Sequence, residues 1–563
     1  MNLEFRYAGR SGIINGLETA SLAFATNTLR ETTFFDGSLA QPLLMREALA
    51  ALYAVVVSDY KYRPKDRAEF FAWLAEQDRK FLATLGLKNN EVRQELEAVE
   101  ARLSELDALR KERMKPFYRA RRSFFEYIYE DQYELEYLLD PVITVHPDEV
   151  SFEAFSKDES TYARLAAKHE LFNKVDSFEC GTTNIDFSAK LHNELEKLRS
   201  YRETRFGVDA DGFAVASDDG QSHKEKKIEL PDSWVMGFLQ VHSTMELSMT
   251  HITLAPIDLF NICRYLRRRK AKVSPRSLRF ELTPGQTVTA VLEPWEHKIE
   301  LAGPGIYEGK EEIIRTWGRD RLQVLARLIP VCRKVDLYLS GKGMPTIYLC
   351  DLGPITFTLA LSGWTDNDWT GETRFGLLTR RLEVTTDELT QSYHAMRKLR
   401  LATDSELAKE TGLGTEKCRS SLSYLCQVGR AMFDLGGGVY RHRDLFMEPF
   451  SAKKAARYAE QASEEHDPRA KEARSIFESN NVRIIARRPV STGFKLSGSA
   501  AGVDGRRVRP LIHVDSDSHI IEASCTCPFA RKNKLTKGPC EHILALRLAH
   551  MSRLESEDRI NPS

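Results

Sequence analysis

The spacing of apolar positions changes several times along the chain, and each change predicts a different kind of element. In residues 1–208, short apolar runs such as residues 48–57 are typical of buried helices. Between residues 88 and 115, apolar side chains from Val92 to Leu109 recur at intervals of four and three. This heptad-like stripe predicts a long helix, which could pack on its own domain or form a coiled coil with another chain. We therefore expect residues 1–208 to be mostly helical.

Alternation with a period of two dominates the middle of the chain. Residues 209–227 are rich in Gly, Asp and Ser and then in Lys, which predicts a linker. Beyond this linker, six segments alternate as strands do: 278–282, 288–292, 298–301, 335–339, 346–349 and 355–359. Helical patterns at 256–269 and 316–328 interrupt them. The sequence therefore predicts a mixed α+β domain over residues 228–390.

Residues 391–450 predict two short helices followed by a strand pair. Thr403 and Glu406 form a capping box at the start of the first helix, and Gly412 is placed to end it. Residues 430–443 read as strand, glycine turn and strand. Helix, turn, helix and a two-stranded wing resemble a winged helix.

Winged helices bind DNA or protein, and both alternatives are open for this segment. If it binds DNA, Lys417 and Arg419 on the second helix would face the major groove. Arg430, Arg441 and Arg443 of the wing would then contact phosphates.

The C-terminal part contains the strongest chemical signal. Residues 451–480 are charged and Ala-rich, which predicts a helical linker, and residues 551–563 are polar and predict a disordered tail. Between them, residues 481–550 contain two ligand pairs, Cys525-x-Cys527 and Cys540-x-His542, separated by twelve residues. Three Cys and one His fill the tetrahedral shell that zinc prefers and leave no position open for substrate. The spacing therefore predicts one structural zinc ion.

The elements around these ligands are also informative. The segment before Cys525 alternates as a β-hairpin does, and the segment after His542 has the apolar face of a helix. The pattern C-x-C-x(12)-C-x-H between a hairpin and a helix resembles the SWIM zinc finger. The alternative is that these thiols cluster by chance, but clustered Cys and His are typical of a metal site.

The zinc module is locally basic, although the whole chain is neutral. Lys+Arg and Asp+Glu each number 81, so any binding of nucleic acid has to come from a local patch. The candidate nucleic-acid-binding residues in the module are Arg506, Arg507, Arg509, Arg531, Lys532, Lys534 and Lys537. We regard this end of the chain as the best candidate surface for DNA or RNA.

Length and cysteine usage limit the class of protein. A chain of 563 residues is long enough for several domains. The other cysteines are scattered among apolar neighbours and read as buried thiols rather than disulfides. We find no signal peptide pattern and no long apolar run. We therefore expect a cytoplasmic protein without a membrane partner.

Four further stretches resemble a bacterial family of SWIM zinc-finger proteins encoded beside a MoxR-type AAA+ ATPase and a von Willebrand A-domain protein. These stretches are residues 230–241, 291–296, 361–369 and 433–443. The resemblance implies a non-enzymatic adaptor that works with these two partners.

Two other features could be binding sites, and each also has a purely structural interpretation. The cations between Arg264 and Arg276 could bind phosphate or form a solvated helix end. Asp366 and Asp368 could hold a divalent ion or belong to a structural turn with tryptophan anchors. No phosphate-binding glycine loop and no catalytic triad is recognisable.

Three functions remain open after these observations. The sequence favours a non-enzymatic zinc-binding scaffold or adaptor that contacts proteins. The alternatives are a DNA- or RNA-binding protein that uses the basic zinc module and the winged helix, and an enzyme with an unrecognised site. The predicted fold is α+β multidomain, with a helical N-terminal region, a central α+β domain, a winged-helix-like segment and a C-terminal ββ-zinc-α module.

Overall fold

A computed structural model gives the fold, and two compact units make up the chain, residues 61–138 and all the remaining residues. The structure describes residues 11–60, 141–209, 232–271, 275–363, 369, 384–446, 450–451 and 468–560, except for short gaps at 16–18, 27–32, 186, 188, 342–343, 491–492, 502–504 and 515–519. In the smaller unit it describes only residues 99, 101–103 and 105–106, which are helical. Val99, Leu103 and Leu106 of the predicted heptad stripe are exposed there. The rest of that stripe lies outside the described residues.

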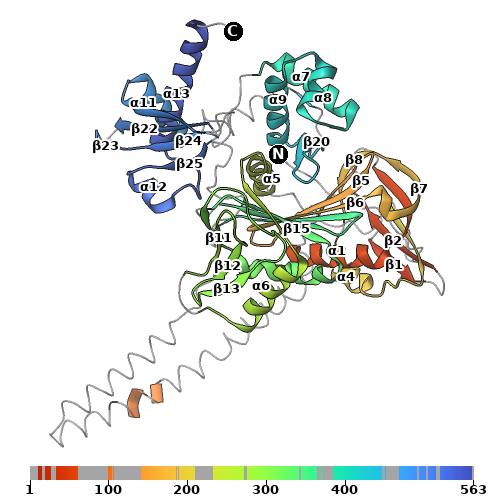
Figure 1. Cartoon of the computed structure of the whole chain (residues 1–563). Coiled ribbons are helices and arrows are strands. Elements are labelled where there is room, and N and C mark those ends of the chain that lie inside the picture. Colours follow the sequence, from red (N-terminus) through yellow and green to blue (C-terminus); the bar gives the residue numbers. More distant parts are fainter. Residues whose placement is uncertain are drawn as a thin grey trace, which may run out of the picture. The chain divides into compact units, whose positions relative to one another are not determined.

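An eight-stranded antiparallel sheet is the largest element of the bigger unit (Figure 1). Its strands in spatial order are β10 (Thr250–Leu254), β15 (Lys334–Leu339), β16 (Thr346–Asp351), β17 (Ile355–Leu361), β6 (Thr161–Lys168), β5 (Glu149–Phe155), β4 (Val142–Val145) and β8 (Gly181–Asn184). Two three-stranded meanders meet where β6 pairs with β17, with Leu165 opposite Phe357. One sheet therefore takes strands from both sides of the predicted linker, so residues 209–227 do not separate two domains.

The prediction of a mostly helical N-terminal region is wrong for the described residues. A second sheet has the order β1 (Gly12–Asn15), β2 (Thr19–Ala25), β9 (Glu203–Asp209), β3 (Phe34–Leu39) and β7 (Phe172–Glu179). The helices there are α1 (Pro42–Val56), α4 (Ala189–Leu195) and the short 3-10 helix η1 (His169–Leu171). Strands β4 and β5 are buried along their whole length and β6 along nearly all of it. Strands buried on both faces lose the alternation that identifies a strand in sequence, which explains the error.

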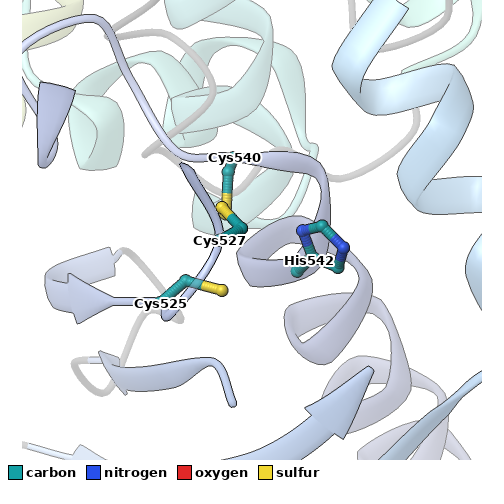
Figure 2. Close-up of side chains that lie close together, drawn as sticks. All are labelled: Cys525, Cys527, Cys540 and His542. Atoms are coloured by element: carbon teal, nitrogen blue, oxygen red, sulfur yellow. The ribbon is translucent and has the colours of Figure 1, made fainter. Parts of the chain in front are cut away.

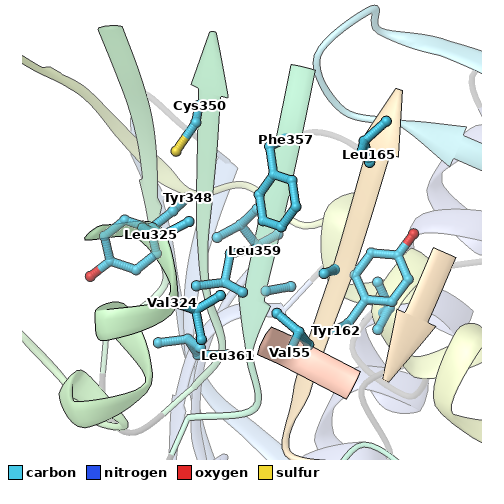
Figure 3. Close-up of a cluster of buried hydrophobic side chains, with 14 of the residues drawn as sticks. Val55, Tyr162, Leu165, Val324, Leu325, Tyr348, Cys350, Phe357, Leu359 and Leu361 are labelled. Carbon is cyan, nitrogen blue, oxygen red and sulfur yellow. The ribbon is translucent and has the colours of Figure 1, made fainter. Parts of the chain in front are cut away.

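Part of the apolar core of this unit packs against one face of the eight-stranded sheet (Figure 3). Val55 of α1 and Leu325 of the 3-10 helix η2 (Arg319–Arg327) pack there near Leu359 of β17. Another 3-10 helix, η3 (Ile329–Val331), follows η2. Fully burying one such side chain contributes about 1.5 to 3 kcal/mol. This core makes the sheet a firm support for the elements attached to it.

A smaller four-stranded sheet accompanies helix α6 (Pro256–Arg268). Its order is β13 (His297–Glu300), β12 (Thr289–Leu292), β11 (Leu278–Leu282) and β14 (Glu312–Thr316). Asp258 caps α6 by accepting a hydrogen bond from the Ala255 amide at 2.9 Å. The same carboxylate accepts from the Ala302 and Gly303 amides at 2.8 Å, so it ties the start of α6 to the segment after β13.

The segment predicted to be a winged helix contains the expected helices and strands. Its elements are α7 (Thr386–Leu399), β18 (Leu401–Ala402), α8 (Asp404–Thr411), α9 (Thr415–Gln427), β19 (Ala431–Asp434) and β20 (Val439–His442). Thr403 Oγ accepts from the Glu406 amide at 3.2 Å, and Gly412 ends α8 with a φ of 72°. Helix α5 (Asp232–Met245) contacts α9 and β19. The winged-helix assignment itself stays a prediction.

The C-terminal module is a five-stranded sheet with helices. Its elements are α11 (Pro468–Glu478), β21 (Val482–Val490), β22 (Gly493–Ala501), β23 (Arg507–Val508), β24 (Leu511–Val514), β25 (Ile520–Ser524), α12 (Pro528–Asn533) and α13 (Glu541–Ile560). Helix α13 lies so close to the sheet that a Cβ on Gly498 would be 2.5 Å from Leu546. Any larger residue at Gly498 would therefore force the Leu546 side chain to shift.

Two predicted boundaries of this module are wrong. Ala473 and Ile476 of α11 pack with Leu544 and Ala545 of α13, so the second half of the predicted linker belongs to the module. Helix α13 also continues to Ile560, past the predicted start of the tail at residue 551. The apolar face of α11 is short and Ala-rich, which made its packing hard to recognise in the sequence.

Candidate metal centre and charged surfaces

The four predicted ligands converge at the junction of β25 and α13 (Figure 2). Cys525 and Cys527 follow β25, Cys540 immediately precedes α13, and His542 lies in its first turn. All four side chains are buried, and their ligand atoms lie within 4.8 Å of one another. The hairpin and the helix thus bring together two pairs of ligands that are twelve residues apart in sequence.

This donor set fits one zinc ion. Two zinc–sulfur bonds of about 2.3 Å span at most about 4.6 Å, so small side-chain rotations bring every ligand atom within bonding reach of one ion. Three thiolates and one imidazole complete the tetrahedral shell, and no position is left for a reacting water. The cluster is therefore positioned to hold one structural zinc ion.

Neighbouring groups orient the ligands. The Ala530 amide donates to Cys527 Sγ at 3.4 Å, so the same sulfur caps helix α12. Glu541 Oε1 lies 2.8 Å from Nδ1 of His542. A carboxylate at one ring nitrogen holds a zinc-bound imidazole in place while the other nitrogen binds the metal.

The thiols are close enough to share protons. Hydrogen bonds with Cys525 and Cys540 lower the pKa of Cys527 well below its ordinary value. The contact with Cys527 raises the pKa of Cys525 to about 11, and contacts with Cys525 and Cys527 raise the pKa of Cys540. Burial alone would lower the pKa of His542, but hydrogen bonds to Cys527 and Glu541 raise it to about 9. Zinc binding releases such protons, so its affinity rises with pH.

A comparison with protein families decides what this cluster is. Residues 511–550 match the SWIM zinc finger. The SWIM zinc finger therefore covers the β24–β25 hairpin, all four ligands and the first half of α13, and the predicted zinc site is confirmed.

Other comparisons extend over more of the chain. No curated protein matches the chain. Among solved structures, the proliferating cellular nuclear antigen of Entamoeba histolytica is 15% identical, with 39% of this chain and 88% of that chain covered and a TM-score of 0.28. The PCNA2–PCNA3 complex of Sulfolobus tokodaii is 10% identical, with 43% and 96% covered and a TM-score of 0.28.

The structure describes no helix that is both long enough and apolar enough to cross a membrane.

The basic side chains of the SWIM zinc finger are exposed. Arg531 and Lys532 of α12 and Lys534 just beyond it lie between the two ligand pairs, and none forms an ion pair with another described residue. Arg507 lies in β23, Arg506 and Arg509 flank this strand, and all three side chains are also exposed. Lys537 is half-buried, and its carbonyl accepts a hydrogen bond from Arg469 at 2.8 Å. We call Arg531, Lys532 and Lys534 the knuckle cations.

Lys417 and Arg419 differ from the knuckle cations because each has an acidic partner. Lys417 pairs with Glu388 of α7, and Arg419 lies 2.8 Å from Asp404 of α8. These pairs reduce the positive charge on the outer surface of α9. Nucleic-acid binding by Lys417 and Arg419 stays a prediction.

The wing arginines do not face solvent, which contradicts their predicted contacts with phosphate. Arg443 Nη1 donates to both carboxylate oxygens of Glu153 at 2.7 and 2.8 Å, and both side chains are fully buried. Tyr162 donates to the same carboxylate at 2.7 Å. The Arg443 guanidinium also lies 4.6 Å from the ring centre of Phe238.

Arg441 continues this buried network. It lies 2.9 Å from Asp434 and 2.7 Å from Asp148, and Arg164 pairs with Glu149 and Asp434. We call this set the arginine junction; its members are Asp148, Glu149, Glu153, Arg164, Asp434, Arg441 and Arg443. The arginine junction joins strands β5 and β6 of the large sheet to the β19–β20 strand pair. Sequence patterns gave no means of predicting these contacts.

Buried histidines lie beside the arginine junction. Burial, together with the charges of nearby arginines, lowers the pKa values of His146 and His242 well below the ordinary value. Burial likewise lowers the pKa of His442 to about 4. The junction therefore holds several imidazoles in the neutral form at pH 7.

The predicted site for a divalent ion lies outside the described residues. Asp366 and Asp368 belong to the undescribed segment 364–368. Trp369, which follows them, is fully buried, as expected of a tryptophan anchor.

Proposed function

We propose that the protein binds nucleic acid through its SWIM zinc finger and that the remaining domains form the support. The observation that carries the proposal is the position of the knuckle cations. They are exposed, they lie on the segment that the two zinc ligand pairs enclose, and no described acidic side chain neutralises them.

Phosphate binding requires cations that are exposed and that have no acidic partner. A cation that already has a carboxylate partner gains little from a phosphate, whereas a free cation releases counterions from the nucleic acid. Arg507 and Arg509 add positive charge, and the Arg509 amide donates to Thr526, between the first two ligands, at 3.0 Å. This bond supports placing β23 and the knuckle cations on one surface.

The proposal can be tested with the full-length protein and fluorescent single- and double-stranded DNA and RNA at low salt. Zinc content is measured in the same samples, and each titration is repeated after a chelator has removed the metal. We expect binding by the zinc-loaded protein and at least about tenfold weaker binding without zinc, because the loop depends on the metal for its fold. Absence of binding at low salt by protein with one zinc per chain would overturn the proposal.

We propose a protein adaptor as the second candidate function. The arginine junction supports it, because buried ion pairs fix the register of two elements and so suit a rigid scaffold. The candidate partners are a MoxR-type AAA+ ATPase and a von Willebrand A-domain protein. A pulldown from cells that express both partners would test this candidate, and recovery of neither would count against it.

A further inference from the structure

Helix α6 and strand β13 line an open basic cleft outside the SWIM zinc finger. The cleft has a volume of about 340 Å³, which falls within the range of small-molecule sites. Its lining includes Asn261, Arg264, Tyr265 and Arg268 of α6 and His297 and Lys298 of β13. We propose that this cleft binds a phosphate-bearing ligand, either a free nucleotide or the backbone of a nucleic acid.

Two guanidinium groups provide the charge. Arg264 and Arg268 are four residues apart on α6, so they project from the same side of the helix. Both are exposed, and neither forms an ion pair with any residue that the structure describes. One guanidinium group can donate two parallel hydrogen bonds to the oxygens of a phosphate, which an ammonium group cannot do.

The opposite wall adds a third cation and an aromatic surface. Lys298 lies in the cleft but is also 3.1 Å from Glu281, so the arginines carry most of the uncompensated charge. The rings of Tyr265 and His297 stack with centres 4.2 Å apart and planes within 8°. Trp295 packs edge-on against Tyr265, which holds this wall in place. None of the described residues that line the cleft is a carboxylate that would repel an anion.

A simple helix-end role does not account for this arrangement. Cations in the last turn of a helix stabilise its dipole, and Arg267 and Arg268 have that position. That role, however, requires neither a lysine from a separate strand nor a cleft between helix and strand. Because cations from both α6 and β13 line one cleft, a ligand-binding role is favoured over a helix-end role. Arg267, Arg269 and Lys270 extend the positive surface beside the cleft.

The test uses full-length zinc-loaded protein and two probes, a fluorescent ATP analogue and a labelled 12-nucleotide single-stranded DNA. The variant Arg264→Gln/Arg268→Gln removes the two guanidinium groups. Its control, Arg267→Gln/Lys270→Gln, removes the same charge from the same helix end but outside the cleft lining. All four positions are exposed, so both variants should keep the melting temperature of the wild type.

We expect at least one probe to bind the first variant about tenfold more weakly than the wild type, since hydrogen bonds to charged groups are the strong ones. The control variant should lose much less affinity for the same probe. A loss confined to the ATP analogue identifies a free nucleotide as the ligand, and a loss confined to DNA identifies nucleic-acid phosphates. Equal affinities in the variant and the wild type for both probes, or an equal loss in the control, would overturn the inference.

This site does not depend on the proposed function. A variant that replaces the three knuckle cations with alanine should keep its affinity for the ATP analogue. Failure of DNA binding by the SWIM zinc finger would therefore leave the result for this cleft unchanged.

Discussion

The arginine junction and the SWIM zinc finger use basic side chains in opposite ways. In the junction, Arg443 is fully buried and paired with Glu153. In the zinc finger, Arg531 and its neighbours are exposed and have no described acidic partner. A count of Lys and Arg in either segment would give no hint of this difference. Charge indicates a binding surface only when it is both accessible and uncompensated.

The two regions also obtain their stability from different sources. The junction lies against a large apolar core, so its ion pairs fix how the elements fit together. The zinc finger module also buries apolar side chains, among them Leu496, Ile512 and Leu546, but we expect zinc binding to supply a large part of its folding free energy. Perturbing each region should therefore have distinct and separable effects.

The largest effect should follow from losing a zinc ligand. Cys540→Ser removes one of four ligands, and structural zinc contributes about 10 to 16 kcal/mol of binding free energy in small zinc domains. We expect loss of the metal and local unfolding of residues 482–550, measured by metal analysis and hydrogen exchange, while the large sheet stays protected. Cys180→Ser, which changes a thiol outside the cluster, is the control. Unchanged zinc stoichiometry and melting in Cys540→Ser would contradict the prediction.

A smaller but still large effect should follow from breaking the junction. Arg443→Met leaves the buried carboxylate of Glu153 without its cation, which typically costs about 3 to 5 kcal/mol. Urea denaturation should show this loss, and adding Glu153→Met should recover much of it. Lys417→Met breaks an exposed pair and should cost about 1 kcal/mol or less. Similar losses of unfolding free energy in Arg443→Met and Lys417→Met would contradict the proposed difference between the buried and the exposed ion pair.

The histidines beside the junction predict a dependence of stability on pH. The pKa of His442 is about 4 in the folded protein and 6.5 ordinarily, so the unfolded chain binds more protons between these values. Stability is therefore lost as the pH falls from about 6.5 towards 4, by about 1.4 kcal/mol per pH unit for this group. Urea denaturation of the wild type and of His442→Gln at pH 7 and pH 5.5 measures the difference. An equal pH dependence in both proteins would refute this assignment.

The sequence predicted the zinc site well because the residues that specify this site are close together in the chain. Four ligands at fixed spacing, a hairpin and a helix suffice to specify the site, and each has its own pattern. Helix α8 was predictable for the same reason, since Thr403 and Gly412 mark its two ends.

Contacts between distant segments were not predictable in this way. The pairing of β6 with β17 joins residues almost two hundred positions apart, and fully buried strands carry no alternation that would identify them. The wing arginines show the same limit. A basic residue in a strand reads as exposed unless its partner, here Glu153 of β5, is known.

The most direct test of the central claim compares the salt dependence of binding in two triple variants. Arg531→Ala/Lys532→Ala/Lys534→Ala removes the uncompensated cations, and Lys174→Ala/Lys334→Ala/Lys398→Ala removes the same charge from paired positions. We expect the slope of log Kd against log salt on duplex DNA to fall by about 2 to 3 in the first variant and to stay near the wild type in the second. Equal slopes in the wild type and the first variant would show that the SWIM zinc finger does not carry the phosphate contacts.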